Sequence, residues 1–199
     1  GFGRFYTDAQ VSYAWHDIGT LRSIDLPAPA GSTLATAAYD ASAWSANAEL
    51  GAIWRLGRVN VQPSLAVAYV DSAADGFTES GPGYALIVSG ADGQSLSTTL
   101  ALRASGQWMM AKTPVVPDFK IGWRHEYLDD NSTFDAAFID DPAVVMSIVS
   151  SQVQADSLVV SSGATFGVTK NFEVFFDVNG QYNADASLTN ASGGVRVTW

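Results

Sequence analysis

Apolar and polar residues alternate along most of the chain. Between residues 59 and 69, every odd position holds an apolar or ring side chain, and every even position holds a polar or small one. Residues 172–179 repeat the alternation, and only Phe175 interrupts their polar positions. Successive side chains of a β-strand point to opposite faces, so this pattern predicts strands with one apolar and one polar face.

The alternation defines eight segments, most of them longer than the roughly 9–11 residues that a tilted membrane strand needs. No run approaches the roughly 18–20 unbroken apolar residues of a membrane helix. The sequence therefore predicts an all-β fold, an antiparallel transmembrane β-barrel with eight strands in this chain. The segments lie at residues 4–16, 42–57, 58–71, 95–109, 115–128, 155–169, 171–184 and 187–199.

The links between the segments alternate in length. Long links are predicted at residues 17–41, 72–94 and 129–154, and short ones at 56–58, 110–114 and 169–171; the last link, at 184–186, is short where a long one is expected. Outer-membrane barrels have short periplasmic turns and longer extracellular loops. We therefore expect the long links outside the cell and both chain ends on the periplasmic side. Within the third long link, residues 140–152 are compatible with a short helix or with a hairpin arm that extends the barrel.

Composition supports a membrane barrel and argues against nucleic acid. Charged residues make up 15% of the chain, against about 25% in a typical soluble protein. The net charge of −10 argues against a nucleic-acid partner, which would require a basic patch. The chain has no cysteine, which excludes disulfides and cysteine-based metal sites. Residues 1–4 are not a signal peptide, so we expect the chain to begin inside a larger precursor or after processing.

Aromatic residues concentrate near the segment ends. Tyr and Trp favour the interface between membrane and water, because one end of each side chain is apolar and the other is polar. An aromatic girdle is the favoured interpretation, and the alternative is that these residues form the core of a soluble barrel. They are Phe5, Tyr13, Trp15, Trp44, Trp54, Tyr69, Trp108, Trp123, Tyr127, Tyr182 and Trp199.

The polar face should line the lumen if the apolar face meets lipid, and we expect most of its residues to be hydrated without individual roles. No catalytic, cofactor-binding or metal site is predicted, and the chain is not expected to be an enzyme. His16 and His125 lack zinc-site spacing, and Asp129-Asp130-Asn131 with Asp135 is better explained as a solvated acidic loop than as a weak cation site. The lumen-facing candidates are Glu49, Arg55, Arg103, Lys120, Arg124, Glu126, Asp177 and Arg196.

Four stretches resemble the autotransporter β-domain, in the order in which that family carries them. Pro117 opens a strand that ends in Trp123-Arg124-His125-Glu126, and Pro63–Tyr69 is followed by Gly76-Phe77-Thr78-Glu79 and 85–88. Ser97–Arg103 resembles a strand ending in Gly-Leu-Arg, with Ala101 in place of the usual Gly. The chain closes on Gly193–Trp199, an alternating stretch with a terminal aromatic residue.

This resemblance implies an outer-membrane translocator that anchors an N-terminal passenger and exports it by type V secretion. Family barrels have twelve strands around an α-helix, and the chain matches about the last eight, so residues 1–199 are expected to be the C-terminal portion of the domain. Implied partners are the lipid bilayer with lipopolysaccharide, the barrel-assembly machinery and the protein's own passenger. Val195, Val197 and Trp199 would form the assembly signal. Some relatives cut their own helix, for which Glu49, Glu126 and Asp177 are the candidate acids, but no cleavage site can be assigned.

Two other readings remain open. A standalone eight-stranded outer-membrane barrel could act as an anchor or surface-binding protein, because an eight-stranded barrel is filled by side chains and would not conduct a polypeptide. A soluble eight-stranded ligand carrier would place the apolar face inward. Segment length, the alternation of link lengths and the terminal Trp199 favour the membrane.

Overall fold

The computed structural model describes residues 4–25, 31–81, 84–128, 133–149 and 154–199. Every regular element in these ranges is a β-strand, and none of the described residues forms a helix long and apolar enough to cross a membrane. The strands are β1 (Phe5–Asp25), β2 (Ser32–Ala52), β3 (Trp54–Leu56), β4 (Val59–Ala74), β5 (Phe77–Thr78), β6 (Leu86–Val88), β7 (Ala91–Gly106), β8 (Trp108–Met110), β9 (Thr113–Glu126), β10 (Thr133–Phe138), β11 (Asp141–Val149), β12 (Asp156–Gly167), β13 (Phe172–Tyr182) and β14 (Ser187–Val197).

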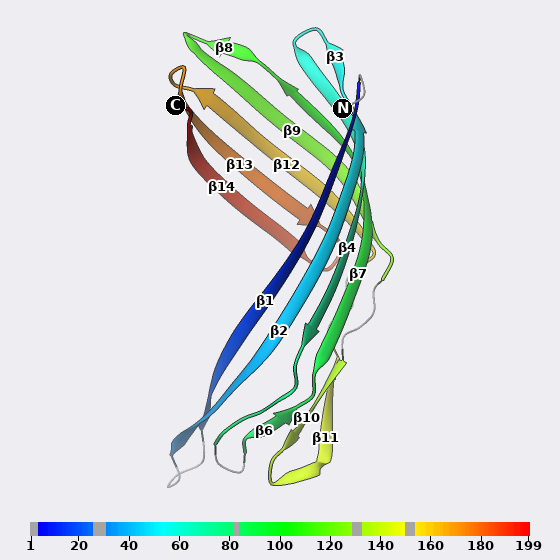
Figure 1. Cartoon of the computed structure of the whole chain (residues 1–199), viewed down its shortest axis with the longest axis vertical. Helices are drawn as coiled ribbons and strands as arrows, with labels where there is room; N and C mark the ends of the chain where they lie inside the picture. The colour runs from blue at the N-terminus through cyan, green and yellow to red at the C-terminus, as the bar shows by residue number, and fades with distance from the viewer. Residues whose placement is uncertain (1–3, 26–30, 82–83, 129–132, 150–153) are drawn as a thin grey trace.

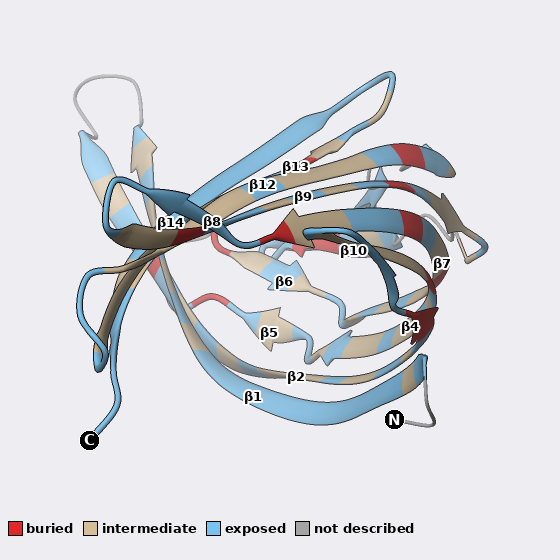
Figure 2. Cartoon of the chain, turned by 90° about the horizontal axis from the view of Figure 1, so that it is seen from above, coloured by how far each residue is buried: buried red, intermediate tan, exposed pale blue. Residues whose placement is uncertain are grey.

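Eight long strands form one antiparallel sheet in the order β1-β2-β4-β7-β9-β12-β13-β14, with β3 and β8 as short continuations. This confirms the eight predicted segments in sequence order. The sheet curls into an arc, and both chain ends lie at one end of it (Figures 1 and 2). In the described residues β1 and β14 each pair on one side only, so the arc is open between them.

The apolar positions lie on the convex face of the arc. One row runs through Leu50, Leu65, Leu100, Trp123 and Leu158, each directly opposite the next on the neighbouring strand. All five side chains are exposed. A soluble carrier would turn this face inward, so the sheet contradicts that alternative and matches a barrel wall that meets lipid.

A second sheet lies at the end of the molecule opposite the chain ends (Figure 1). It has the order β11-β10-β6-β5. A bridge between Thr36 and Ser80 joins it to the free edge of β2 beyond the last residue that pairs with β4. The wall therefore continues past the main sheet through strands that come from two different links.

The prediction that the three long links are loops outside the strands is wrong, because the described residues of each link contain strands. Residues 17–25 and 32–40 continue β1 and β2 in unbroken register from Asp17↔Asp40 to Asp25↔Ser32, because cross-strand pairing satisfies the backbone even where apolar alternation fades. Links 72–94 and 129–154 likewise contain β5–β6 and β10–β11. For the described part of 140–152, the hairpin alternative is right, since β11 pairs with β10. The predicted short links are confirmed as tight connections between strands. In the first of them, Gly57 takes the positive φ (64°) that the turn into β4 requires.

Candidate functional site: the polar concave face

The concave face carries the polar positions of every long strand. One row runs Gln62, Arg103, Lys120, Ser161 and Asn179, again with direct neighbours on successive strands. Strand register fixes this arrangement, because a shift by one residue would exchange the two faces along a whole strand. The polar row and the leucine row are therefore opposite sides of the same wall.

Ten of these side chains surround one hollow of about 320 Å³. They come from seven strands, from β1 to β13, and strands so far apart in the sheet can share a hollow only on its concave side. Charges of both signs are present, and opposite charges in a narrow space favour pairing. The lining residues are Tyr6, Glu49, Gln62, Ser64, Arg103, Asp118, Lys120, Ser161, Asp177 and Asn179.

Two short contacts organise the hollow. The Tyr6 hydroxyl donates to Glu49 Oε1 at 2.6 Å, which links β1 to β2. Arg103 Nε donates to Asp118 Oδ2 at 2.5 Å, which links β7 to β9. Charge-assisted hydrogen bonds of this kind are about twice as strong as neutral ones. Each contact joins side chains of two adjacent strands along the concave surface, and neither contact spans the hollow.

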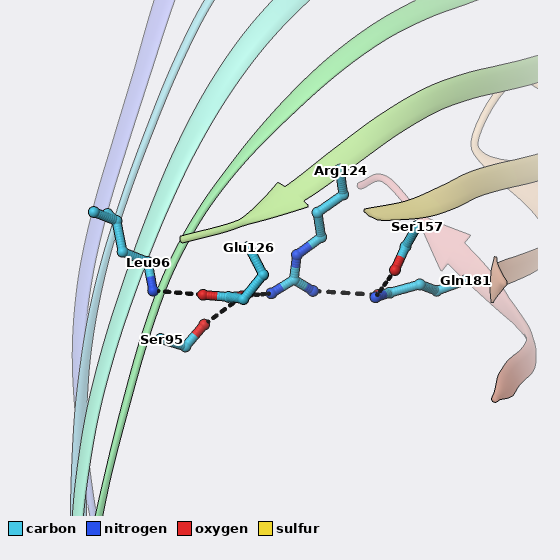
Figure 3. Close-up of polar contacts among 6 residues, drawn as sticks. All are labelled: Ser95, Leu96, Arg124, Glu126, Ser157 and Gln181. Carbon is cyan, nitrogen blue, oxygen red and sulfur yellow. Dashed lines mark hydrogen bonds and ion pairs between the residues drawn. The ribbon is translucent and has the colours of Figure 1, made fainter. Parts of the chain in front are cut away.

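A second polar network lies around Glu126, the last residue of β9 (Figure 3). Glu126 accepts hydrogen bonds from the Ser95 hydroxyl at 2.8 Å, from the Leu96 backbone N–H at 2.7 Å and from Arg124 Nη2 at 3.1 Å. Arg124 Nη1 also donates to Gln181 Oε1 at 3.2 Å, and Gln181 donates to Ser157 at 3.2 Å. The network joins β9 to β12 and β13 and to Ser95 and Leu96 of β7.

The eight lumen-facing candidates all fall on the concave register, but the structure does not gather them into one site. Glu49, Arg103, Lys120 and Asp177 share the hollow, and Arg124 with Glu126 forms the separate network. Near the end of the arc that holds the chain termini, Arg196 Nη1 donates to Glu173 at 3.2 Å, and both side chains are exposed. Arg55, on β3, lies opposite Asn60 and is also exposed.

The Trp-Arg-His-Glu motif is divided between the two faces. Arg124 and Glu126 lie on the concave face, whereas Trp123 and His125 lie on the convex face. Trp123 Nε1 donates to Asp156 Oδ1 at 2.8 Å, and His125 Nδ1 lies 2.9 Å from the same oxygen. The motif therefore supplies a concave ion pair and a convex aromatic contact from four consecutive residues.

Sequence reasoning missed Tyr6 and Asp118. Asp118 shares the period-two positions of Lys120 and Arg124, so the alternation alone would have found it. Tyr6 shares the period-two positions of Asp8 and Gln10, so alternation would have found it too, although its ring is typical of the aromatic girdle. Its pairing opposite Gly51 places it on the concave face.

The acidic groups do not assemble a metal site among the described residues: no group of three or more His, Cys, Asp and Glu side chains could hold an ion. Asp129, Asp130 and Asn131 lie outside the described residues, and Asp135 accepts a hydrogen bond from Ser147 at 2.6 Å. At the other end of the chain, Val195 and Val197 lie on the convex face, and Trp199 is fully exposed beyond β14.

Comparisons with known proteins find relatives that match the whole chain. Two extracellular serine proteases of Serratia marcescens are each 26% identical to the chain, over 198 and 205 residues, and each match covers all of this chain but 18% of the relative. The chain thus spans under a fifth of these relatives. The solved structure of CarO from Acinetobacter baumannii is 14% identical, covering 96% of this chain and 80% of that one, with a TM-score of 0.15, too low to support an argument.

The decisive match is to a family model. The model described as the autotransporter beta-domain covers residues 1–179, which is most of the chain. The sheet order, the polar concave face and the apolar convex face are those of an outer-membrane barrel wall. The chain therefore belongs to the autotransporter beta-domain family, the outer-membrane translocator domains of type V secretion in Gram-negative bacteria.

Proposed function

We propose that residues 1–199 are the C-terminal portion of a translocator that anchors its own N-terminal passenger and exports it along the concave face. The proposal rests on the hollow that Tyr6, Glu49, Arg103 and Asn179 line together with six further polar side chains. A polypeptide crossing a membrane needs a polar route away from the hydrocarbon, since each unsatisfied backbone group there costs several kcal/mol. The chain's role is conduit and anchor, without bond chemistry or cofactor.

The open arc supports completion of the barrel by further strands. The described parts of β1 and β14 each have one unpaired edge, and open sheet edges do not occur in lipid. We propose that strands outside these 199 residues pair with both edges. Intact mass and N-terminal peptide mapping of the protein from its native membrane test this: a mature chain that extends upstream of Gly1 by several strands supports it. A mature N-terminus at Gly1 would contradict it and favour the standalone barrel.

The convex face is proposed to contact lipid and, in the outer leaflet, lipopolysaccharide. Trp15, Trp44 and Trp123 are exposed towards the end of the arc nearer the second sheet, and Trp54 and Trp108 towards the end nearer the chain termini. Aromatic side chains at two levels match the two interfaces of a bilayer. They support the girdle interpretation over a soluble core.

The barrel-assembly machinery is the second proposed partner. Val195, Val197 and Trp199 are all exposed, so an assembly factor could reach them before the barrel enters lipid. Replacing Trp199 with Ala is expected to lower the amount of barrel in the outer membrane, with Thr198→Ala as control. The amount of barrel is measured by heat-modifiable gel migration. Equal amounts of the two variants would mean that Trp199 is not part of the assembly signal.

Export along the concave face can be tested with two adjacent serines on β12. Ser161 lines the hollow, whereas Ser162 lies opposite Phe119 and Val178 on the convex face. In the full-length protein, Ser161→Trp should lower the fraction of cells that display a protease-accessible passenger, because the indole narrows the route. Ser162→Trp points into lipid and should leave display unchanged.

The amount of folded barrel, read by heat-modifiable migration, separates blocked export from failed assembly. Reduced display with normal barrel levels in Ser161→Trp supports the proposal. Normal display in both variants, at equal barrel levels, contradicts export along this face and favours the anchor reading.

A further inference from the structure

Three tight turns at the end of the arc that holds the chain termini each carry one cation. They connect β3 to β4, β8 to β9 and β12 to β13, and β3 and β8 can be seen at this end in Figure 1. The cations are Arg58, Lys112 and Lys170, and all three residues are exposed. None of them forms an ion pair with a residue that the structure describes. The three charges are therefore accessible to a partner outside the chain.

The backbone of each turn is well defined. Gly57 and Ala111 each precede the cation of their turn, and both take a positive φ, of 64° and 59°. In the third turn, the Asn171 side chain donates to the Thr198 carbonyl at 2.7 Å. The cations therefore extend from short, fixed connections at the edge of the wall.

An aromatic residue precedes each cation by four positions in the sequence. Trp54 and Trp108 are exposed, and Phe166 is half-buried. Trp108 and Phe166 both lie opposite Val115 of β9, which places them in one row on the convex face. Aromatic side chains on the outer face of a membrane barrel gather where the hydrocarbon meets the headgroups.

The cations lie just beyond that level. In the first two hairpins, two strand residues separate the aromatic residue from the turn, a rise of about 7 Å along the strand. The rise along the membrane normal is smaller, because barrel strands are tilted. The headgroup layer is roughly 5–7 Å deep on each side of the hydrocarbon. Arg58 and Lys112 are therefore placed at the level of the lipid phosphates, where a long side chain can keep its charged end.

Carboxylates are nearly absent from the sequence around these cations. Residues 53–63 and 107–117 contain no Asp or Glu. Residues 165–175 contain Glu173 alone, which accepts a hydrogen bond from Arg196 at 3.2 Å. A zwitterionic lipid brings an ammonium group beside its phosphate, and these turns offer no free acid to receive it. An anionic phospholipid carries the phosphate without the ammonium, so its headgroup matches the turns better.

We propose that Arg58, Lys112 and Lys170 form a basic rim that binds anionic phospholipid headgroups in the periplasmic leaflet. The aromatic residues that precede them contact the same lipids where the acyl chains begin. Each Lys or Arg near an anionic membrane surface contributes about a fivefold preference. The rim requires the wall to span the membrane, but it does not depend on export of a passenger.

Lipid retention by the full-length protein tests the rim. The protein is reconstituted in vesicles with equal amounts of phosphatidylglycerol and phosphatidylethanolamine and extracted in mild detergent, and the lipids that stay bound are counted by mass spectrometry. We expect phosphatidylglycerol to be enriched about fivefold or more. Arg58→Gln with Lys112→Gln should remove most of the enrichment. Adding Lys170→Gln should bring the ratio to that of the vesicle.

The matched control removes two cations from the concave face at the same end of the arc. Arg55 lies opposite Asn60, and Arg196 is paired with Glu173, so both side chains belong to the face turned away from lipid. Arg55→Gln with Arg196→Gln should leave the enrichment unchanged. Equal losses in the two double variants would mean that only net charge matters, and would overturn the rim.

Three other results would also overturn the proposal. The first is equal retention of the two lipids by the unaltered protein, and the second is full enrichment in the triple variant. The third is loss of phosphatidylglycerol when inorganic phosphate is added during extraction, which would mean that the turns bind free phosphate and not a lipid. Heat-modifiable migration confirms that each variant is folded; if a double variant is not, Lys112→Gln against Arg196→Gln makes the same comparison.

Discussion

Glu126 of β9 accepts the backbone N–H of Leu96 at the point where the ladder between β7 and β9 ends. The carboxylate oxygen lies 2.7 Å from that nitrogen, and the Tyr127 N–H donates to the Leu96 carbonyl at 2.8 Å. The side chain therefore replaces the carbonyl that a further paired residue would have supplied. It lets the chain leave the sheet after Glu126 without an unsatisfied donor on Leu96.

Replacing Glu126 with Ala should lower the free energy of unfolding by about 2 kcal/mol, because hydrogen bonds to charged groups contribute roughly 1.5–3 kcal/mol. The loss leaves the Leu96 donor and Arg124 without their partner. Urea unfolding of the full-length protein in lipid vesicles measures it. The control Glu173→Ala removes an exposed pair, for which at most about 1 kcal/mol is expected. Equal effects of the two substitutions would contradict a special role for Glu126.

Thr20 carries the one buried side-chain polar atom without a hydrogen-bond partner among the described residues. Burying an unpaired hydroxyl costs about 1–3 kcal/mol, so Thr20→Val, of similar shape, should raise the free energy of unfolding by about 1 kcal/mol. Thr98→Val is the control, since the Thr98 hydroxyl lies 3.1 Å from the Tyr127 hydroxyl and its loss should bring no gain. A higher urea midpoint for Thr98→Val than for Thr20→Val would contradict this reading.

Acid should weaken the contact between β1 and the segment from β5 to β6, which the Arg22–Glu79 ion pair makes. Hydrogen bonds from Arg22 hold the pKa of Glu79 below its ordinary value, assisted by the Leu86 N–H. A folded pKa below the unfolded one means that the stabilisation is present above the ordinary carboxyl pKa and is lost as pH falls through the depressed value. Hydrogen–deuterium exchange of peptides covering 77–81 and 84–88 should quicken there beyond the intrinsic pH effect. Glu79→Gln should abolish that step; a step that persists in Glu79→Gln assigns it to another group.

The stability that Asp40 contributes should change with pH in the opposite direction. Its pKa is raised by a hydrogen bond shared with Asp17, and Asp75 adds repulsion. A folded pKa above the unfolded one contributes stability at low pH that is lost as pH rises through the raised value. Exchange at the β1–β2 pairing around Asp40 should therefore quicken as pH rises through the carboxyl range. Asp40→Asn should remove this dependence, whereas Asp92→Asn, on another strand, should retain it.

Alternation in the sequence predicted the two faces of the wall because one residue of register decides the side of every side chain on a strand. It could not predict that β1 and β2 continue through residues 17–25 and 32–40. Residues 17–25 and 32–40 are exposed or half-buried on both faces for most of their length, so no apolar stripe marks them as strands. Their pairing is backbone pairing, with Asp17 opposite Asp40, two residues that local preference would place in a loop.

The Arg22–Glu79 ion pair was equally invisible to sequence reasoning. Arg22 and Glu79 are separated by 57 positions and lie in stretches that alternation assigned to links. The Gly-Phe-Thr-Glu stretch was noticed only for its resemblance to a family motif. Its contacts show why the residue types matter: Phe77 stacks on Tyr39, and Glu79, two positions further along the chain, pairs with Arg22.

Two adjacent residues of β13 test which face meets lipid. Val178 lies opposite Ser162 and Ala191 on the convex face and is about half exposed, whereas Asn179 lines the concave hollow. Val178→Arg should lower the free energy of unfolding in lipid vesicles by about 2–4 kcal/mol, the cost of Arg near the bilayer midplane. Asn179→Arg places the same charge in a hollow that holds charges of both signs, and there it should cost less than about 1 kcal/mol.

Val178→Arg and Asn179→Arg can be compared directly because they add the same side chain one position apart on the same strand. Strand propensity and side-chain entropy then change almost equally, and only the solvent on each face differs. Urea unfolding in vesicles at equal protein-to-lipid ratio gives both values. A cost for Asn179→Arg as large as that for Val178→Arg would mean that the concave face is not hydrated. A negligible cost for both would mean that neither face of β13 is in the hydrocarbon.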